Sequence, residues 1–264
     1  MKRLLEQIGE TTLWALETLG GINLLFWRTV AAFFPPDFDK RETWRNLYKV
    51  GVKSYPIVVM TALFTGALMV IQSAHFVQST GATIVIPLGT GFTVLAEIGP
   101  VLIGLMFSGR VGANNTAELG TMAVTEQIDA LRALAIDPIR YLVVPRFISM
   151  CVMLLLLTAL GDFFAILGAM VTNGALIDFS PELFFNEMII LHFLDEYLMG
   201  LCKAATFGIA ISVVSCYFGM TVRGGAVGVG RAVNNSVVAT AIAIFVLDLL
   251  TNLLWVQAGW LTTG

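Results

Sequence analysis

The sequence predicts an all-α, polytopic integral membrane protein. Of its 264 residues, 57% are hydrophobic and only 12% are charged, which is about half the charged fraction of an ordinary soluble domain. The charges are also unevenly placed, since none falls between Lys53 and Glu97. These observations exclude a water-soluble enzyme and a disordered chain. They also exclude a nucleic-acid-binding module, because a formal net charge of -3 supplies no basic field for phosphates.

Five stretches are long and apolar enough to cross a bilayer, which takes about 20 mainly apolar residues per α-helix. They cover approximately residues 56–77, 86–111, 147–172, 193–218 and 237–257. Outside these stretches, Lys and Arg fall only in alternate segments: up to Lys53, from Arg110 to Arg146, and at Arg223 and Arg231. The positive-inside rule therefore predicts a cytoplasmic N-terminus and a C-terminus on the outer side.

Three further segments flank the spans. Residues 1–34 are rich in aromatic side chains but broken by charges and glycines, so we expect a helix that lies at the interface rather than a sixth span. Residues 39–53 resemble a polar cytoplasmic helix with Trp44 and Tyr48 on one side, which divides the chain into an N-terminal region, 1–55, and a membrane domain, 56–264. Ser180-Pro181-Glu182 predicts the start of a short amphipathic helix, ending near Leu191, at the outer face.

The connection between the second and third spans predicts an amphipathic cytoplasmic helix over about 117–137. Its apolar face carries Val124, Ile128, Leu131 and Ala135, and its charged face carries Glu126, Asp129 and Arg132. Asp137-Pro138 should end it, because the residue before proline is pushed out of the α region. Such a helix could lie on the membrane surface or dock a partner. The acidic residues favour docking, since anionic lipid would repel them.

Four ionisable residues fall near the midpoints of predicted spans, where a charge is costly unless it is paired or hydrated: Glu97, Asp162, Lys203 and Asp248. We expect them to face the bundle interior. Because one ammonium neutralises only one acid well, we expect a structural ion pair between Lys203 and Asp248. Glu97 lies just before Pro100, whose missing N–H should kink the second span and could open a cavity there.

Small residues recur at every fourth position in two rows: Gly104, Ser108 and Gly112, and Gly200, Ala204, Gly208 and Ser212. Such rows let helices approach closely, and we interpret them as packing within one subunit rather than as a dimer seam. The glycines at 224, 225, 228 and 230 predict a flexible cytoplasmic turn. His75 and His192 lack partners at usable spacing, and Cys151, Cys202 and Cys216 stand singly, so neither a catalytic nor a metal site is expected.

Several motifs resemble the MlaE/YrbE family of ABC transporter permeases over nearly the whole chain. They are Ala96-Glu-Ile-Gly-Pro-Val, Ser108-Gly-Arg-Val-Gly, Thr116-Ala-Glu-Leu-Gly-Thr-Met, Thr125-Glu-Gln-Ile-Asp-Ala-Leu and Asp137-Pro-Ile-Arg with Pro145-Arg146. The resemblance implies a homodimeric inner-membrane permease with two copies of a cytoplasmic ATPase, which binds ATP and Mg, and a periplasmic or membrane-anchored MCE-domain lipid-binding protein. Such systems move phospholipids or similar lipids between inner membrane and periplasm.

The resemblance also implies site residues. It implies that the cytoplasmic helix is a coupling helix seated in a groove of the ATPase. The expected coupling residues are Glu118, Glu126, Gln127, Asp129, Arg132 and Asp137. The lipid cavity would be lined by Met69, Phe76, Val77, Glu97 and Ile98. Ala96 stands where some relatives have a basic residue, so no headgroup-binding cation is expected at that position.

The sequence itself agrees with a transport subunit that depends on a separate ATPase. It contains no G-x-x-x-x-G-K-[ST] motif, so nothing in it cradles nucleotide phosphates, and we expect no cofactor in this chain. The alternative is an ion-coupled secondary transporter or channel that uses the four intramembrane charges as a relay. The absence of a detectable inverted repeat and the presence of the amphipathic helix count against it.

Overall fold

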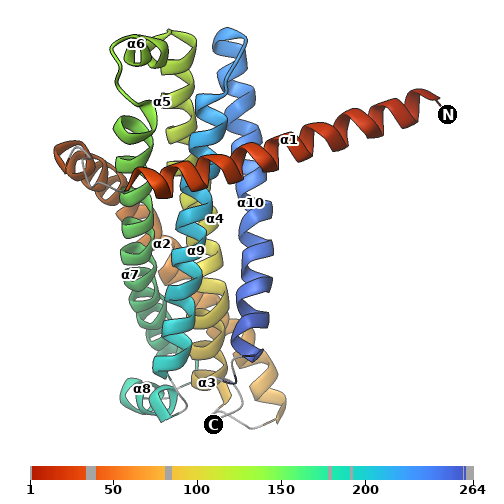
Figure 1. Cartoon of the computed structure of the whole chain (residues 1–264). Helices are drawn as coiled ribbons and strands as arrows, with labels where there is room; N and C mark the ends of the chain where they lie inside the picture. The colour runs from red at the N-terminus through yellow and green to blue at the C-terminus, as the bar shows by residue number, and fades with distance from the viewer. Residues whose placement is uncertain are drawn as a thin grey trace.

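The computed structural model describes residues 2–33, 40–80, 85–177, 180–190, 193–257 and 259, and the regular structure in these ranges is entirely helical. Long helices run side by side as a bundle (Figure 1). One end of the bundle carries the short helix α6 (Gln127–Ala133), and the opposite end carries α8 (Pro181–Ile190). These are called the α6 end and the α8 end below.

Five helical segments are long and apolar enough to cross a membrane, in agreement with the predicted all-α, five-span architecture. They are Lys40–Ala74, Ile86–Val124, Ile139–Leu176, Leu194–Met220 and Gly225–Gln257. Four of them belong to α2 (Lys40–Thr80), to η3 (Ile139–Val143) with α7 (Val144–Ile177), to α9 (Phe193–Met220) and to α10 (Gly225–Gln257). The second span is composite: α3 (Val85–Phe92), η1 (Thr93–Ile98), α4 (Gly99–Phe107), η2 (Ser108–Gly112) and α5 (Ala113–Val124).

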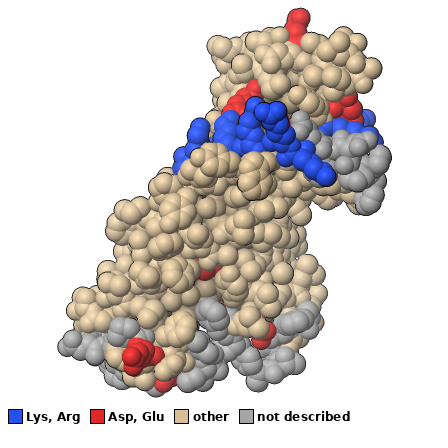
Figure 2. All heavy atoms as spheres, turned by 90° about the vertical axis from the view of Figure 1, so that its left-hand side faces the viewer, with Lys and Arg blue, Asp and Glu red and all other residues tan. Residues whose placement is uncertain are grey.

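The charged ends of the spans lie together. On the face shown in Figure 2, Lys and Arg side chains form a band towards the α6 end, and beyond it the visible coloured charges are a few Asp and Glu side chains, most of them near the α8 end. A long uncharged surface bordered by a cationic band is the pattern that a membrane-spanning bundle presents.

The boundary predicted before the first span is wrong. In the described part of this segment, residues 40–53, there is no separate helix, because α2 is continuous from Lys40 and carries Pro56 within it. The N-terminal part of α2 packs against α7, where the Ser149 hydroxyl donates a hydrogen bond to the carbonyl of Thr43 at 3.1 Å. Thr43 and Asn46 are buried there. This packing holds the charged segment in line with the apolar one.

The irregularity expected at Pro100 takes the form of a π-helical turn. The N–H of Gly99 donates to the carbonyl of Val94, five residues back, as in a π-helix. Pro100 then falls in the first turn of α4. The proline, which has no N–H to donate, therefore directly follows the change in hydrogen-bond spacing.

Helix α1 (Lys2–Ala32) crosses the other helices at a steep angle (Figure 1). It is not among the segments apolar enough to span, in line with the interfacial prediction. Leu25 and Thr29 are buried against the bundle, whereas Trp14 and Trp27 are exposed. At the other end, the helix predicted after Ser180 is present as α8, and the Leu183 N–H donates to Ser180 Oγ at 3.2 Å, as expected of an N-cap.

Small residues do set close helix contacts within the subunit. A Cβ added at Gly200 would lie 2.1 Å from the carbonyl oxygen of Leu95, and one added at Gly208 would lie 3.0 Å from the Cα of Cys151. The tightest crossing, however, involves glycines that the small-residue rows do not include. A Cβ at Gly66 would lie 1.8 Å from the carbonyl oxygen of Ala165.

The glycine-rich turn is shorter than predicted. Only Gly224 and Gly225 have positive φ, at 90° and 65°, and α10 already begins at Gly225. Gly228 and Gly230 are therefore helical. Gly228 lies against the turn, because a Cβ there would be 2.0 Å from the carbonyl oxygen of Arg223.

Candidate functional site

Three of the four intramembrane charges meet at one point. The Nζ of Lys203 on α9 lies 2.8 Å from Glu97 Oε2 and 2.9 Å from Asp248 Oδ1 on α10. The Lys203 side chain is completely buried, whereas the side chains of Glu97 and Asp248 are 31% and 18% exposed. The pair expected between Lys203 and Asp248 is present. The expectation that Lys203 would pair with only one acid is wrong.

Glu97 itself lies within the π turn η1. A π turn holds an extra residue, so its side chains are rotated relative to those of a regular α-helix. Gly200, one turn before Lys203, has no side chain and lets α9 approach the Leu95 carbonyl of η1. The result is one ammonium between two carboxylates, which links the second, fourth and fifth spans.

Asp162 does not join this cluster. Its side chain is buried, with 1% exposure, and neither carboxylate oxygen has a hydrogen-bond partner in the described part of the chain. It borders a cavity of about 470 Å³ whose other walls are Leu95, Ala159, Phe163, Ile166, Leu167, Met170, Phe185 and Tyr197. The four-residue cluster expected from the sequence is therefore an ion trio plus one isolated acid in an apolar wall.

This separation predicts opposite responses to neutralising an acid. Asp162→Asn should leave the midpoint of thermal unfolding unchanged or higher, because the carboxylate has no hydrogen-bond partner among the described residues to lose. Asp248→Asn should lower it, because it weakens the environment of a fully buried ammonium. Thermal unfolding of the two purified variants in the same detergent measures the contrast, and an equal loss in both would contradict the separation.

The predicted helix over 117–137 is two helices. α5 ends at Val124, Glu126 adopts a left-handed conformation with φ of 60°, and α6 then runs from Gln127 to Ala133. The bend buries Ile128 in a cluster with Leu119 of α5 and Leu25 of α1. Burying an isoleucine stabilises by about 1.5–3 kcal/mol, which exceeds the cost of about 1–2 kcal/mol for a left-handed residue.

The residues expected to couple to an ATPase divide into three groups. Glu126, Gln127, Asp129 and Arg132 are exposed on and beside α6, and Arg132 pairs with Asp129 at 2.7 Å. Asp137 begins the next segment instead of ending α6, since its Oδ1 accepts a hydrogen bond from the N–H of Ile139 at 2.9 Å. Glu118 faces α2 and α7, where it pairs with Lys49 and, at 3.7 Å, with Arg146.

A polar network anchors α5 to its neighbours. The Thr116 hydroxyl lies 2.9 Å from Ser236 Oγ of α10 and 3.1 Å from the carbonyl of Ser215 in α9. All three residues are buried. These contacts connect α5, which leads into α6, with the fourth and fifth spans.

The residues expected to line a lipid cavity are only partly described. Met69 packs against Ala62, Val94 and Ala165, and Ile98 is half-buried beside Glu97. The side chains of Phe76 and Val77 lie outside the described part of the structure, as do that of His75 and the whole of His192. Among the residues described, no group of three or more His, Cys, Asp or Glu could hold a metal ion.

Comparison with known proteins agrees with this architecture. The profile of the family described as Permease MlaE matches residues 43–254. A probable ABC transporter permease protein of Rickettsia felis is 36% identical over 250 residues, covering 92% of this chain and 94% of that protein. One of Synechocystis is 37% identical over 246 residues, covering 89% and 94%.

A more distant relative comes from a plant. Protein TRIGALACTOSYLDIACYLGLYCEROL 1, chloroplastic, of Arabidopsis thaliana is 31% identical over 217 residues, covering 82% of this chain and 62% of that protein. The family profile spans all five membrane helices of the structure. The chain is therefore a multi-pass membrane protein of the MlaE permease family.

Proposed function

We propose that the chain is the transmembrane subunit of an ATP-driven transporter that moves phospholipids or similar lipids between the inner membrane and the periplasm, and so contributes to outer-membrane lipid homeostasis. One feature of the structure, the helix α6, supports coupling to ATP hydrolysis. This short helix stands at one end of the bundle, is held by one buried side chain, Ile128, and presents charged residues outward. The family membership and the ABC permease relatives support a partner ATPase, which supplies ATP and Mg.

The proposed assembly is a homodimer with a cytoplasmic ATPase and an MCE-domain lipid-binding protein. The α6 end and the N-terminus are cytoplasmic in this proposal, and the C-terminus is periplasmic, as the distribution of Lys and Arg suggests. Exposed apolar side chains along α10, among them Phe245 and Leu249, are suited to contact with lipid or with the second subunit.

The lipid region of the proposal centres on Glu97. The side chain of Glu97 is the most exposed of the ion trio. Ile98 follows it in the second span, and Met69 lies on the first span. Lipid as the substrate class is supported by the family and by the lipid named in the Arabidopsis relative. Because a carboxylate attracts no phosphate, Glu97 would position the helices rather than bind a headgroup.

Charge reversal on α6 tests the proposal. In proteoliposomes that hold the permease with its ATPase, ATP should drive transfer of a fluorescent phospholipid to the MCE-domain protein. Glu126→Lys with Asp129→Lys should abolish ATPase retention and reduce transfer at least tenfold, because two exposed acids at the docking helix change sign. Membrane insertion should be unchanged.

The matched control reverses two exposed acids on α1, Glu10→Lys with Glu17→Lys. This variant should keep the ATPase and transfer lipid at nearly the normal rate. Normal ATPase retention by the α6 variant would rule out the docking role. Transfer that needs an ion gradient but no ATP would instead establish the ion-coupled alternative.

A further inference from the structure

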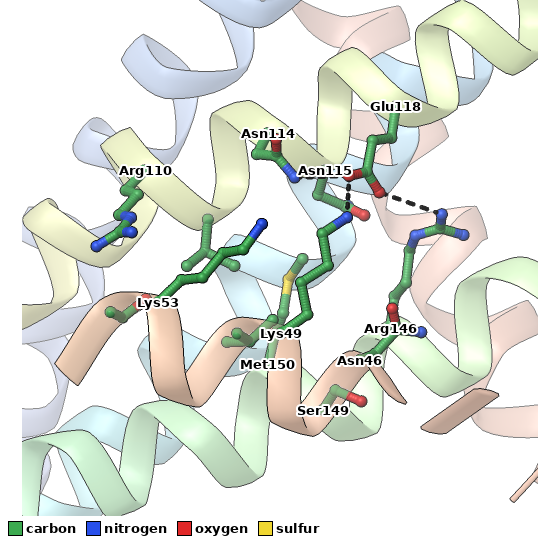
Figure 3. A pocket seen from close by; sticks show the side chains of 13 residues that line it. Asn46, Lys49, Lys53, Arg110, Asn114, Asn115, Glu118, Arg146, Ser149 and Met150 are labelled. Carbon is green, nitrogen blue, oxygen red and sulfur yellow. Dashed lines mark hydrogen bonds and ion pairs between the residues drawn. The ribbon is translucent and has the colours of Figure 1, made fainter. Parts of the chain in front are cut away.

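A polar pocket of about 220 Å³ lies between α2, the end of the second span and the start of α7, on the α6 side of the bundle (Figure 3). Its walls carry four cationic side chains, Lys49, Lys53, Arg110 and Arg146, against one carboxylate, that of Glu118. The lining therefore has a formal excess of three positive charges. A concave site with this excess attracts anions.

Glu118 pairs with only two of these four cations. It pairs with Lys49 and lies 3.7 Å from Arg146, and its Oε1 also accepts a hydrogen bond from Asn114 Nδ2 at 2.8 Å. The other two cations, Lys53 and Arg110, have exposed side chains. In Figure 3, Lys53 extends from α2 across the space towards the facing helix, and Arg110 comes from that helix.

Two buried donors line the same pocket without hydrogen-bond partners. Asn46 is 9% exposed and Ser54 is 3% exposed, and neither Asn46 Nδ2 nor Ser54 Oγ has a partner in the described part of the chain. A buried donor left unpaired costs about 1–3 kcal/mol, so such groups usually have a ligand or a water. Both residues are on α2: Ser54 directly follows Lys53, and Asn46 lies one helical turn before Lys49.

From these observations we propose that the pocket binds a phosphate group, with Lys53, Arg110 and Ser54 as donors. A phosphate monoester or inorganic phosphate offers several oxygens and more than one negative charge at neutral pH, which suits two cations and a neutral donor better than a carboxylate does. Glu118 holds Lys49 and Arg146 in ion pairs. The phosphate belongs either to a lipid headgroup, whose chains would lie along the exposed apolar side chains of α2 beyond Ser54, such as Phe64, or to free phosphate.

This site goes beyond the proposed transport function and lies away from Glu97. Arg110 follows Glu97 by 13 helical residues, about 20 Å along the axis. A binding measurement without ATP or the ATPase therefore tests the site alone, and its failure would leave the transport proposal untouched.

The test uses the full chain in neutral detergent and three probes: dihexanoyl phosphatidic acid, dihexanoylglycerol without phosphate, and inorganic phosphate. Calorimetry should detect phosphatidic acid but not dihexanoylglycerol. Lys53→Ala with Arg110→Ala should weaken binding at least tenfold. Arg41→Ala with Arg45→Ala removes two cations from α2 outside the pocket and should change the affinity less than twofold.

Ser54→Ala separates binding from folding. It removes an unpaired buried hydroxyl, so the free protein should unfold at the same or a higher temperature, whereas phosphate binding should weaken severalfold. Phosphatidic acid binding tenfold more tightly than inorganic phosphate assigns the site to a lipid headgroup, and equal binding assigns it to free phosphate. The proposal is overturned if neither phosphatidic acid nor inorganic phosphate binds. It is also overturned if the Lys53 and Arg110 changes do not weaken binding, or if the Arg41 and Arg45 control weakens it equally.

Discussion

Lys203→Met is expected to lower the free energy of unfolding by about 3 kcal/mol, which is the usual result of breaking a buried ion pair. The side chain of Lys203 is completely buried between Glu97 and Asp248. Methionine keeps most of its volume, so the loss reports the charge and not a cavity. Without the ammonium, two carboxylates remain close together in a region of low dielectric constant, and both are destabilised. Denaturant unfolding of the purified protein in detergent measures the effect.

Neutralising the acids should restore the stability in steps. Lys203→Met with Asp248→Asn should recover only part of the loss, because Glu97 remains unpaired. Adding Glu97→Gln should recover most of it, since ion pairs replaced by uncharged groups are often neutral in energy. Equal stability of the double and triple variants would show that Glu97 does not contribute to the trio. A triple variant as unstable as Lys203→Met alone would contradict the electrostatic explanation.

Gly66→Ala is expected to destabilise the fold by about 3 kcal/mol, at the upper end of the usual cost of overpacking. The added Cβ would lie 1.8 Å from the carbonyl oxygen of Ala165, which is backbone and cannot move aside without moving α7. The reciprocal contact is also tight, because a Cβ at Gly168 would lie 2.3 Å from the carbonyl oxygen of Leu63. Helices α2 and α7 form the most extensive helix pair in the described structure. The whole pair would have to separate.

Gly109→Ala is the matched control. Nothing lies within 4 Å of a Cβ built there, so this change should be neutral or stabilise by about 0.5–1 kcal/mol through the unfolded state. Gly66→Ala and Gly168→Ala should be non-additive, because both widen one crossing. Thermal unfolding of the two single variants, their double variant, Gly109→Ala and the unchanged protein in one detergent measures these effects. If Gly66→Ala were as mild as Gly109→Ala, the close approach of α2 and α7 would be refuted.

The spans could be predicted because each depends on local composition. A run such as 147–172 must bury its backbone groups in its own hydrogen bonds wherever it lies in a bilayer, so length and hydropathy suffice. Their ends were less predictable. α2 extends back to Lys40 because its polar residues pack on α7, a contact with residues about 100 positions away.

The bend before α6 shows why helical periodicity failed between the second and third spans. Periodicity placed Val124, Ile128 and Leu131 on one face of a single helix. In the structure, Ile128 is buried by contacts with α1 and with the segment around Val143, which a local pattern cannot include. Tertiary packing therefore outweighed local helix propensity.

The pocket beside Glu118 was missed for a similar reason. Lys49 and Arg146 contributed to the topology prediction only as positive charges near membrane ends. One feature of the sequence could have indicated the pocket. Polar residues such as Asn46, Asn114 and Asn115 stand in the same segments as these cations, and an interfacial helix facing lipid would not need them. The convergence of α2, α5 and α7 is what turns these separate residues into one site.

The sequence alone predicted five helices able to cross a membrane and the charges that stand within them, and it contains no G-x-x-x-x-G-K-[ST] motif. Those properties follow from composition and motifs within single segments. Only the tertiary structure decided that Lys203 meets both Glu97 and Asp248, that Asp162 stands apart, and that α6 is a separate helix. These depend on the rotation and spacing of helices, which π turns and glycine contacts set between residues far apart in the chain.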